Sequence, residues 1–298
     1  MRQFDFLGKT KYFAPISLVL ILASAILLIP GIRGLRMGID FTGGMEFTVL
    51  FTEAVSTAEL RDVLGSIDTG DVDLSNSVIQ DAEGNKKIIT VQLDDSDMAD
   101  RIVSTVIREF PVDEQGISRS LIAQQVSREL AEKGWQAVLL AIVAILVYIS
   151  WRFRLRYAIG AVAAILHDVI IALGIFALIG VEVNLATIAA FLTIVGYSLN
   201  DTIVIYDRIR ENLKLERKKP IYEIINLSVN QSLSRTLNTS LTTFIPVIIL
   251  FIFGGAVLRG FSLALLVGVI VGTYSSMYIA NPILYAWTMK AGGAKSAK

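Results

Sequence analysis

Six long apolar segments constrain this chain more than any other feature. They occupy residues 13–32, 134–151, 157–180, 185–206, 235–258 and 261–289. Each is close to the ~20 residues that an α-helix needs to cross a hydrocarbon layer. Because a backbone inside that layer must satisfy its own hydrogen bonds, the segments predict six transmembrane helices.

The composition agrees with a membrane protein and excludes several kinds of site. Of the 298 residues, 54% are hydrophobic and 18% are charged, and the mean hydropathy is +0.62, whereas soluble domains carry about 25% charged residues. With no cysteine and a single histidine, His167, the usual zinc sites are out of reach, and we predict no bound metal. Residues 1–12, which include the basic residues Arg2, Lys9 and Lys11, precede an apolar run that is too long for a signal peptide. The first span is therefore predicted to stay uncleaved.

The positive charges predict the orientation of the spans. Sixteen of the 27 lysines and arginines lie before the first span, after the second, after the fourth and after the sixth. The short loops at the opposite ends, around residues 180–184 and 258–260, carry only Arg259. Because basic loops stay in the cytoplasm, both termini (residues 1–12 and 290–298) are predicted to be cytoplasmic.

The long segment at residues 33–133 therefore lies outside, and it predicts a small α+β domain. It carries 10 basic and 19 acidic residues. Apolar residues alternate from Met45 to Phe51 as in a strand, and Ser56-x-x-Glu59 is a capping box that opens a helix. Two strands at 72–80 and 86–93, a helix ended by Pro111 and a last strand in 116–123 complete the pattern. This βαββαβ order predicts a ferredoxin-like arrangement.

Two further features concern the fifth and sixth spans. The cytoplasmic segment 207–234 predicts an amphipathic helix that begins at Pro220 and lies along the membrane before the fifth span. The sixth span carries small residues at four-residue spacing, including Gly268, Gly272 and Ser276. Such a ridge lets helix backbones approach closely, so we interpret it as a packing surface.

Asp201 is the leading candidate for a functional residue. It lies inside the fourth span, before the charged run that begins at Asp207. A carboxylate at that depth costs about 2.5–3.5 kcal/mol on insertion scales. An acid inside the membrane is therefore a functional hypothesis by default.

Other polar residues of the spans complete a candidate relay; they are His167, Asp168, Asn200, Arg235 and Asn238. Asp201 and Arg235 lie on successive spans, which predicts an ion pair between them. A buried carboxylate can bind a proton in a dry environment and release it when a cation or water approaches. The set therefore predicts a proton relay.

Other interpretations of these residues stay open. A buried Asp–Arg pair can fix helix register without moving protons. His167 and Asp168 can be structural, and as neighbours they are expected to point to different sides of their helix. Asp168 and Asp201 on successive spans also resemble the paired carboxylates of an aspartyl protease, but Leu199-Asn200 stands where that signature has glycine. A scaffold whose external domain binds partners is a further alternative.

We predict that the chain is not an enzyme and binds neither a cofactor nor nucleic acid. The sequence contains no nucleotide-binding loop, no nucleophile–base constellation and no cofactor motif. Protons are then the coupling ion. The run from Asp207 and Arg208 to Asn212 is interpreted as an anchor whose arginines meet anionic headgroups of the lipid bilayer.

Five motifs, in order along the chain, resemble those of the SecD/SecF family of protein-export membrane proteins, relatives of the resistance–nodulation–division transporters. They are Gly38-Ile-Asp40-Phe-Thr-Gly43-Gly44 after the first span, Ala164-Ile-Leu-His167-Asp168 in the third, the fourth-span signature Gly196–Asn212, which includes Asp207 and Arg208, then Arg235-Thr236, and Phe253-Gly-Gly255. The resemblance covers essentially the whole chain.

The resemblance implies a subunit of the bacterial cytoplasmic membrane that pairs with SecD, whose six related spans would form the other half of the bundle. Together they would use the proton-motive force to promote the late stage of export of secretory preproteins through the SecYEG channel, after SecA has pushed them. It also implies that Asp201 carries the proton, that Arg235 regulates it and that Asn238 supports them. Gly43 and Gly44 would serve the turn into the first strand, where positive φ suits glycine.

Overall fold

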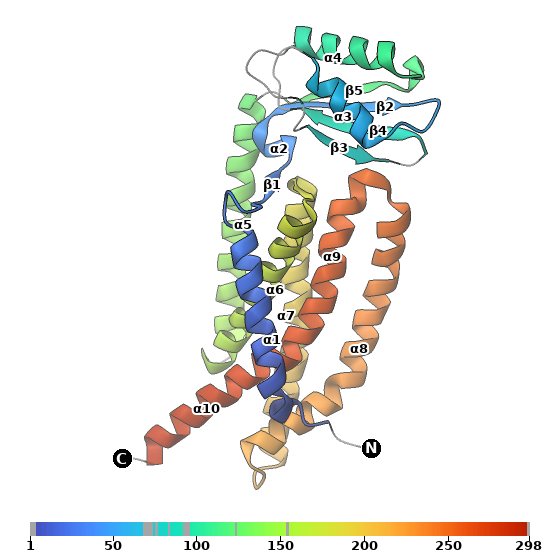
Figure 1. Ribbon diagram of the computed structural model, residues 1–298. Coiled ribbons are helices and arrows are strands. Elements are labelled where there is room, and N and C mark those ends of the chain that lie inside the picture. Colours follow the sequence, from blue (N-terminus) through green and yellow to red (C-terminus); the bar gives the residue numbers. More distant parts are fainter. Residues whose placement is uncertain are drawn as a thin grey trace.

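The computed structural model describes residues 4–67, 74, 77–82, 84–91, 96–122, 124–152 and 155–296. A bundle of long helices carries a small α+β domain at one end (Figure 1). The start of α1 (Phe6–Leu27) and the helix α10 (Asn281–Ser296) both lie at the other end of the bundle. This placement agrees with an even number of crossings.

Within the described residues, six helical stretches are long and apolar enough to cross a membrane, which confirms the predicted six spans. They are α1, α5 (Gln124–Arg152), α6 (Leu155–Ile179), α7 (Leu185–Leu215), α8 (Ile221–Phe253), and a sixth made of α9 (Gly255–Ser275), a π-helical turn (Ser276–Ala280) and α10. The π turn is stabilised by Asn281, whose side chain donates to the Ser276 carbonyl at 2.8 Å.

The first helix is shifted toward the N-terminus relative to the predicted span at 13–32. Its N-cap is Asp5, whose carboxylate accepts a hydrogen bond from the Gly8 backbone. It ends at Leu27, ahead of Gly31 and Gly34, which both have positive φ. The C-cap is Leu28, and the chain beyond it turns through these two glycines, whose positive φ suits glycine.

The cytoplasmic helix and the fifth span, predicted as separate elements, are one helix, α8, and α7 extends to Leu215. No glycine or proline interrupts α8 before Pro246, so nothing in the sequence breaks it. Its first turns bind the start of α1. Asn230 accepts from the Phe4 amide at 2.9 Å and donates to the Phe4 carbonyl at 2.8 Å.

The external domain has the predicted βαββαβ order in its described part. It contains β2 (Gly44–Leu50), α3 (Thr57–Gly65), β3 (Val78–Asp81), β4 (Lys86–Val91), α4 (Ser96–Glu109) and β5 (Ser118–Ile122). The four strands form an antiparallel sheet in the order β3-β4-β2-β5, which is the ferredoxin-like order. Residues 72–73, 75–76, 92–93 and 123 of the predicted strands lie outside the described residues.

The core of the domain lies between this sheet and its two helices. The alternating residues of β2, Met45, Phe47 and Val49, are buried as predicted, against Leu60 of α3 and Ile102 of α4. The predicted capping box is present at the start of α3. Local sequence signals therefore determine this domain well.

Helices α7 and α9 form the most extensive helix–helix contact of the bundle. A Cβ atom on Gly268 would lie 2.2 Å from Cγ1 of Ile194, and one on Gly272 would lie 3.0 Å from Cβ of Ser198. Ser276 is fully buried. The small residues of the sixth span thus allow α9 to approach the helix that carries Asp201.

We expect Gly268→Ala to lower the stability of the chain, because the added methyl must push Ile194 and α7 away. Overpacking of this kind costs about 1–3 kcal/mol. Gly196→Ala is the matched control, since Gly196 lies in α7 with nothing within 4 Å of its position for Cβ. There the gain in helix propensity, about 1 kcal/mol, is expected to appear unopposed. Thermal unfolding of the two variants checks the prediction, and equal stabilisation of both would contradict it.

Candidate functional site

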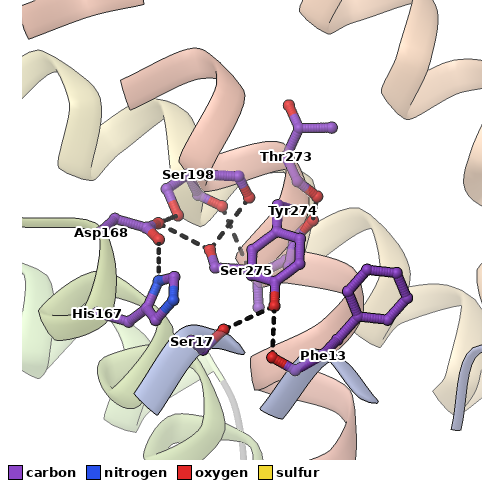
Figure 2. A network of polar contacts seen from close by, with 11 residues as sticks. Phe13, Ser17, His167, Asp168, Ser198, Thr273, Tyr274 and Ser275 are labelled. Atoms are coloured by element: carbon purple, nitrogen blue, oxygen red, sulfur yellow. Dashed lines mark hydrogen bonds and ion pairs between the residues drawn. The ribbon is translucent and has the colours of Figure 1, made fainter. Parts of the chain in front are cut away.

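A buried carboxylate, Asp168 of α6, joins three helices at the centre of the bundle (Figure 2). Its Oδ2 accepts hydrogen bonds from the hydroxyls of Ser198 in α7 at 2.6 Å and Ser275 in α9 at 2.8 Å. Its Oδ1 lies 2.8 Å from Nδ1 of His167. Asp168 is completely buried. Three donors surround it, as a buried carboxylate requires.

His167 extends this network toward α1. Its ring stacks on Tyr274 with centroids 5.9 Å apart. The Tyr274 hydroxyl donates to the Phe13 carbonyl at 2.9 Å and lies 2.6 Å from Oγ of Ser17, as Figure 2 shows. The expectation that the side chains of His167 and Asp168 point apart is wrong, because the ring turns back onto its neighbour. Nε2 of His167 is buried and has no partner among the described residues.

Asp201 of α7 is buried but has far fewer donors than Asp168. Only 2% of its surface is exposed, and its Oδ2 has no hydrogen-bond partner within the described structure. Its Oδ1 lies 3.5 Å from the Thr239 hydroxyl of α8. That hydroxyl also lies 2.9 Å from the Thr236 carbonyl, a closer acceptor for its single proton. Asp201 is therefore a buried carboxyl without a firm donor.

The predicted ion pair between Asp201 and Arg235 is not formed in the part of the chain that the structure describes: none of its ion pairs within 4.0 Å joins these residues. Arg235 is exposed on α8, and so are Asn238 one turn later and Asn200 on α7. Three polar side chains of candidate membrane spans thus face outward from this chain. A surface of this kind needs a polar or protein partner, because lipid hydrocarbon cannot satisfy it.

A cavity of about 530 Å³ lies between α7 and α8 at the end of the bundle opposite the external domain. Its walls include Asn200, Asp207, Arg208, Gln231 and Arg235. One of these wall residues, Asn200, is the chain neighbour of Asp201, so the cavity reaches the residue beside this carboxyl.

The charged run at the end of α7 binds protein groups. Asp207 pairs with Arg152 of α5 at 2.8 Å, and Arg208 donates to Gln231 of α8 at 2.7 Å. Asn212 donates to Ser228 at 2.9 Å. The run that the sequence suggests as a headgroup anchor therefore also fastens α7 to its neighbours.

The glycine motif connects the external domain to the start of α7. Gly43 and Gly44 have φ of 74° and 134°, values that suit glycine alone, and they lead directly into β2. Asp40 accepts a hydrogen bond from the Leu185 amide, at the first residue of α7, at 2.9 Å. Gly38 lies against this start too, donating to the Val183 carbonyl at 2.8 Å. A movement of the external domain would thus reach the helix that carries Asp201.

Three carboxyl groups converge at this junction, outside the spans. Burial raises the pKa of Glu182 to about 7; the nearby Glu46 adds to the rise, while Arg36 opposes it and Asp40 adds a smaller rise. Burial also raises the pKa of Glu46, with a further contribution from Asp40. We therefore expect Glu182 to change its protonation state near neutral pH.

We expect Glu182→Gln to stabilise the chain at pH 8 and to have little effect at pH 4. The folded-state pKa of Glu182, about 7, lies above its ordinary value of 4.5. Folding therefore loses stability as the pH rises through this interval. After allowance for solvent screening, the gain at pH 8 is about 1–2 kcal/mol. Thermal unfolding of both proteins against pH measures it, and a pH-independent difference would contradict it.

The two aspartates that a protease would need to pair have different neighbours. Asp168 binds Ser198 and Ser275, whereas the Thr239 hydroxyl lies 3.5 Å from Asp201. Sequence reasoning missed Ser275, Tyr274 and Thr239. The sequence marks these residues only as polar side chains in apolar spans. No amphipathic pattern shows which side of each helix faces a neighbouring helix.

Two family models match the chain. Residues 102–290 match the model described as "Protein export membrane protein SecD/SecF, C-terminal", and residues 29–55 match the SecD/SecF GG motif. The protein translocase subunit SecF of Petrotoga mobilis is 40% identical over 95% of this chain and 96% of its own length. The corresponding subunit of Desulfurispirillum indicum is 41% identical over 95% and 91%.

Two crystal structures of SecDF are similar to the chain along nearly its whole length. SecDF from Thermus, described as a translocon-associated membrane protein, matches with 36% identity and a TM-score of 0.85 over 96% of this chain. A super-membrane-facing form of SecDF matches with 34% identity and a TM-score of 0.71. The chain spans only 39% and 40% of the lengths of these two SecDF chains.

Proposed function

This chain belongs to the SecD/SecF family of protein-export membrane proteins, and from that premise we propose that it couples proton entry to a late stage of protein export. In this proposal Asp201 takes up and releases the proton. A proton that crosses a membrane potential of 100 mV yields about 2.3 kcal/mol, which is the free energy available from each proton. The chain then acts as part of a motor, without enzymatic chemistry and without a cofactor.

The observation that carries this proposal is the contrast between the two buried carboxyls. Asp168 has three close hydrogen-bond partners, and these hydrogen bonds stabilise one protonation state of its carboxyl. Asp201 has an oxygen without any partner in the described structure, and its neighbour Asn200 lines a charged cavity. A group that must change protonation needs such freedom, because donors that favour one state oppose the other.

We propose that a SecD subunit covers the outward-facing polar residues of α7 and α8. Asn200, Arg235 and Asn238 are exposed on this chain, and the related SecDF chains are more than twice as long. On that face the partner could bring water or acceptors to Arg235. The external domain would contact secretory preproteins as they leave a SecYEG channel served by SecA, in the bacterial cytoplasmic membrane, with both termini in the cytoplasm.

Export in energised membrane vesicles tests the proposal. Vesicles that contain this chain with its SecD partner are compared with vesicles from which the chain is absent, each with and without a proton gradient. We expect the gradient to accelerate release of a secretory substrate only when the chain is present. If the chain raises export equally without a gradient, the scaffold interpretation replaces this proposal.

A further inference from the structure

A large apolar cavity, separate from the charged cavity described above, lies between α5 on one side and α6 and α7 on the other. Its volume is about 690 Å³. Its walls include Trp135, Val138 and Ile142 of α5, Ile165 and Val169 of α6, and Leu192 of α7. All these helices are candidate membrane spans, so the cavity lies at the depth of the hydrocarbon.

Water does not fill this space, because the walls offer almost no polar partner. A buried water needs two to four hydrogen-bonding groups. The walls supply the Trp135 indole N–H and the Thr42 hydroxyl, and that hydroxyl already lies 3.1 Å from the Gly43 carbonyl and 3.2 Å from the Gly38 carbonyl. An empty space of this size is also rare in proteins, because their packing leaves few voids larger than a water molecule. An apolar occupant is therefore required.

The shape of the cavity selects the kind of occupant. Its lining on α5 runs from Ala131 to Leu146, about 22 Å along the helix axis. At the external end its lining includes Phe41 of α2 (Ile39–Thr42) and Val183 of β6 (Glu182–Val183). A transmembrane helix of a partner that lay in the cavity would meet these two elements on its way to water. A hydrocarbon chain can end inside the membrane and needs no such exit.

The attachment of α5 gives a reason for the space. Near its external end α5 is held by Ser127, whose hydroxyl donates to the Ile39 carbonyl at 2.9 Å. Below that point its apolar stretch is not buried against the rest of the chain. The helix meets the bundle again at Ile149, which is buried, and at Arg152, which pairs with Asp207. Between its two ends it leaves a gap to α6 and α7 that something else must fill.

We propose that this cavity is a binding site for one acyl chain of a membrane phospholipid, held between α5 and the helices that carry Asp168 and Asp201. The lipid completes the packing of α5. Because α5 follows β5 directly in the chain, the bound lipid also stabilises the helix to which the external domain is connected.

Two valine variants of α5 test the proposal. Val138→Trp places a bulky side chain in the cavity. Val147→Trp is the matched control, because Val147 is 63% exposed and lies nine residues, or two and a half turns, away on the opposite side of α5. The full chain is purified in complex with its SecD partner and analysed by native mass spectrometry. The complex is also reconstituted in vesicles of phosphatidylethanolamine and phosphatidylglycerol doped with a phosphatidylethanolamine that carries a diazirine on its acyl chain.

We expect the wild type and Val147→Trp to retain the same number of phospholipids and Val138→Trp to retain one fewer. Crosslinks from the diazirine lipid to α6 and α7 should fall several-fold in Val138→Trp alone. Leu192→Trp, on the opposite wall, is expected to give the same loss. It distinguishes a filled cavity from a folding defect caused by Val138→Trp. Equal lipid retention in all variants, or diazirine crosslinks to α6 and α7 that are as frequent in Val138→Trp as in wild type, would overturn the proposal.

Discussion

Replacement of Asp201 by asparagine is expected to remove the gradient-dependent part of export while the chain still folds and assembles. Asparagine has nearly the same shape and volume as aspartate, but it cannot bind and release a proton. The bias from one proton at 100 mV, about 2.3 kcal/mol, corresponds to a factor of about 50 in an equilibrium. That bias should vanish, and export should fall to the level measured without a gradient.

The assay compares this variant with wild type in energised vesicles that also contain the SecD partner. Glu216→Gln is the matched control, because Glu216 caps the end of the same helix but pairs with Lys219 outside the spans. It should keep the full response to the gradient. If Asp201→Asn keeps that response as well, Asp201 is a packing residue and the scaffold interpretation is favoured.

Asp168→Ala is expected to destabilise the bundle severely. The substitution leaves the Nδ1 of His167 and the hydroxyls of Ser198 and Ser275 without their shared acceptor in a fully buried site. Removal of one partner from a buried ionic network costs about 3–5 kcal/mol. Thermal unfolding of the purified complex should show a loss of this size, larger than that of any single surface substitution.

Two serine variants separate the network from burial alone. Ser198→Ala removes one interhelical hydrogen bond and should cost about 1–2 kcal/mol. Ser262→Ala removes a buried hydroxyl of α9 whose hydrogen bonds among the described residues stay within its own helix, to the carbonyls of Leu258 at 2.7 Å and Arg259 at 3.2 Å, and should cost less. Equal losses in the two variants, or an Asp168→Ala protein as stable as wild type, would show that the network does not hold the helices together.

Local patterns predicted the external domain because each of its signals acts within a few residues. The alternation from Met45 to Phe51 has one buried face, and the capping box at Ser56 binds its own helix. The six spans could be predicted equally well, since length and apolarity alone determine whether a helix crosses a membrane. The ends of the helices were harder to predict, because α8 continues through Arg235, where no residue breaks the helix.

The arrangement of the polar residues could not be read in the same way. A transmembrane helix is apolar on nearly every side, so its sequence does not indicate which face meets which neighbour. Ser275 meets Asp168 and Thr239 meets Asp201 only because α9 and α8 pack in one particular rotation. The ion pair between Asp201 and Arg235 was predicted from their place on successive spans, yet Arg235 is turned to the surface of the chain.

Proton movement through the assembled complex tests the central claim most directly. The chain and its SecD partner are reconstituted into vesicles that enclose a pH-sensitive dye, and a proton gradient is imposed in the presence of an export substrate. With wild type and Glu216→Gln we expect a substrate-dependent proton flux, and with Asp201→Asn we expect none. A flux through Asp201→Asn equal to that of wild type would contradict the assignment of Asp201 as the proton carrier.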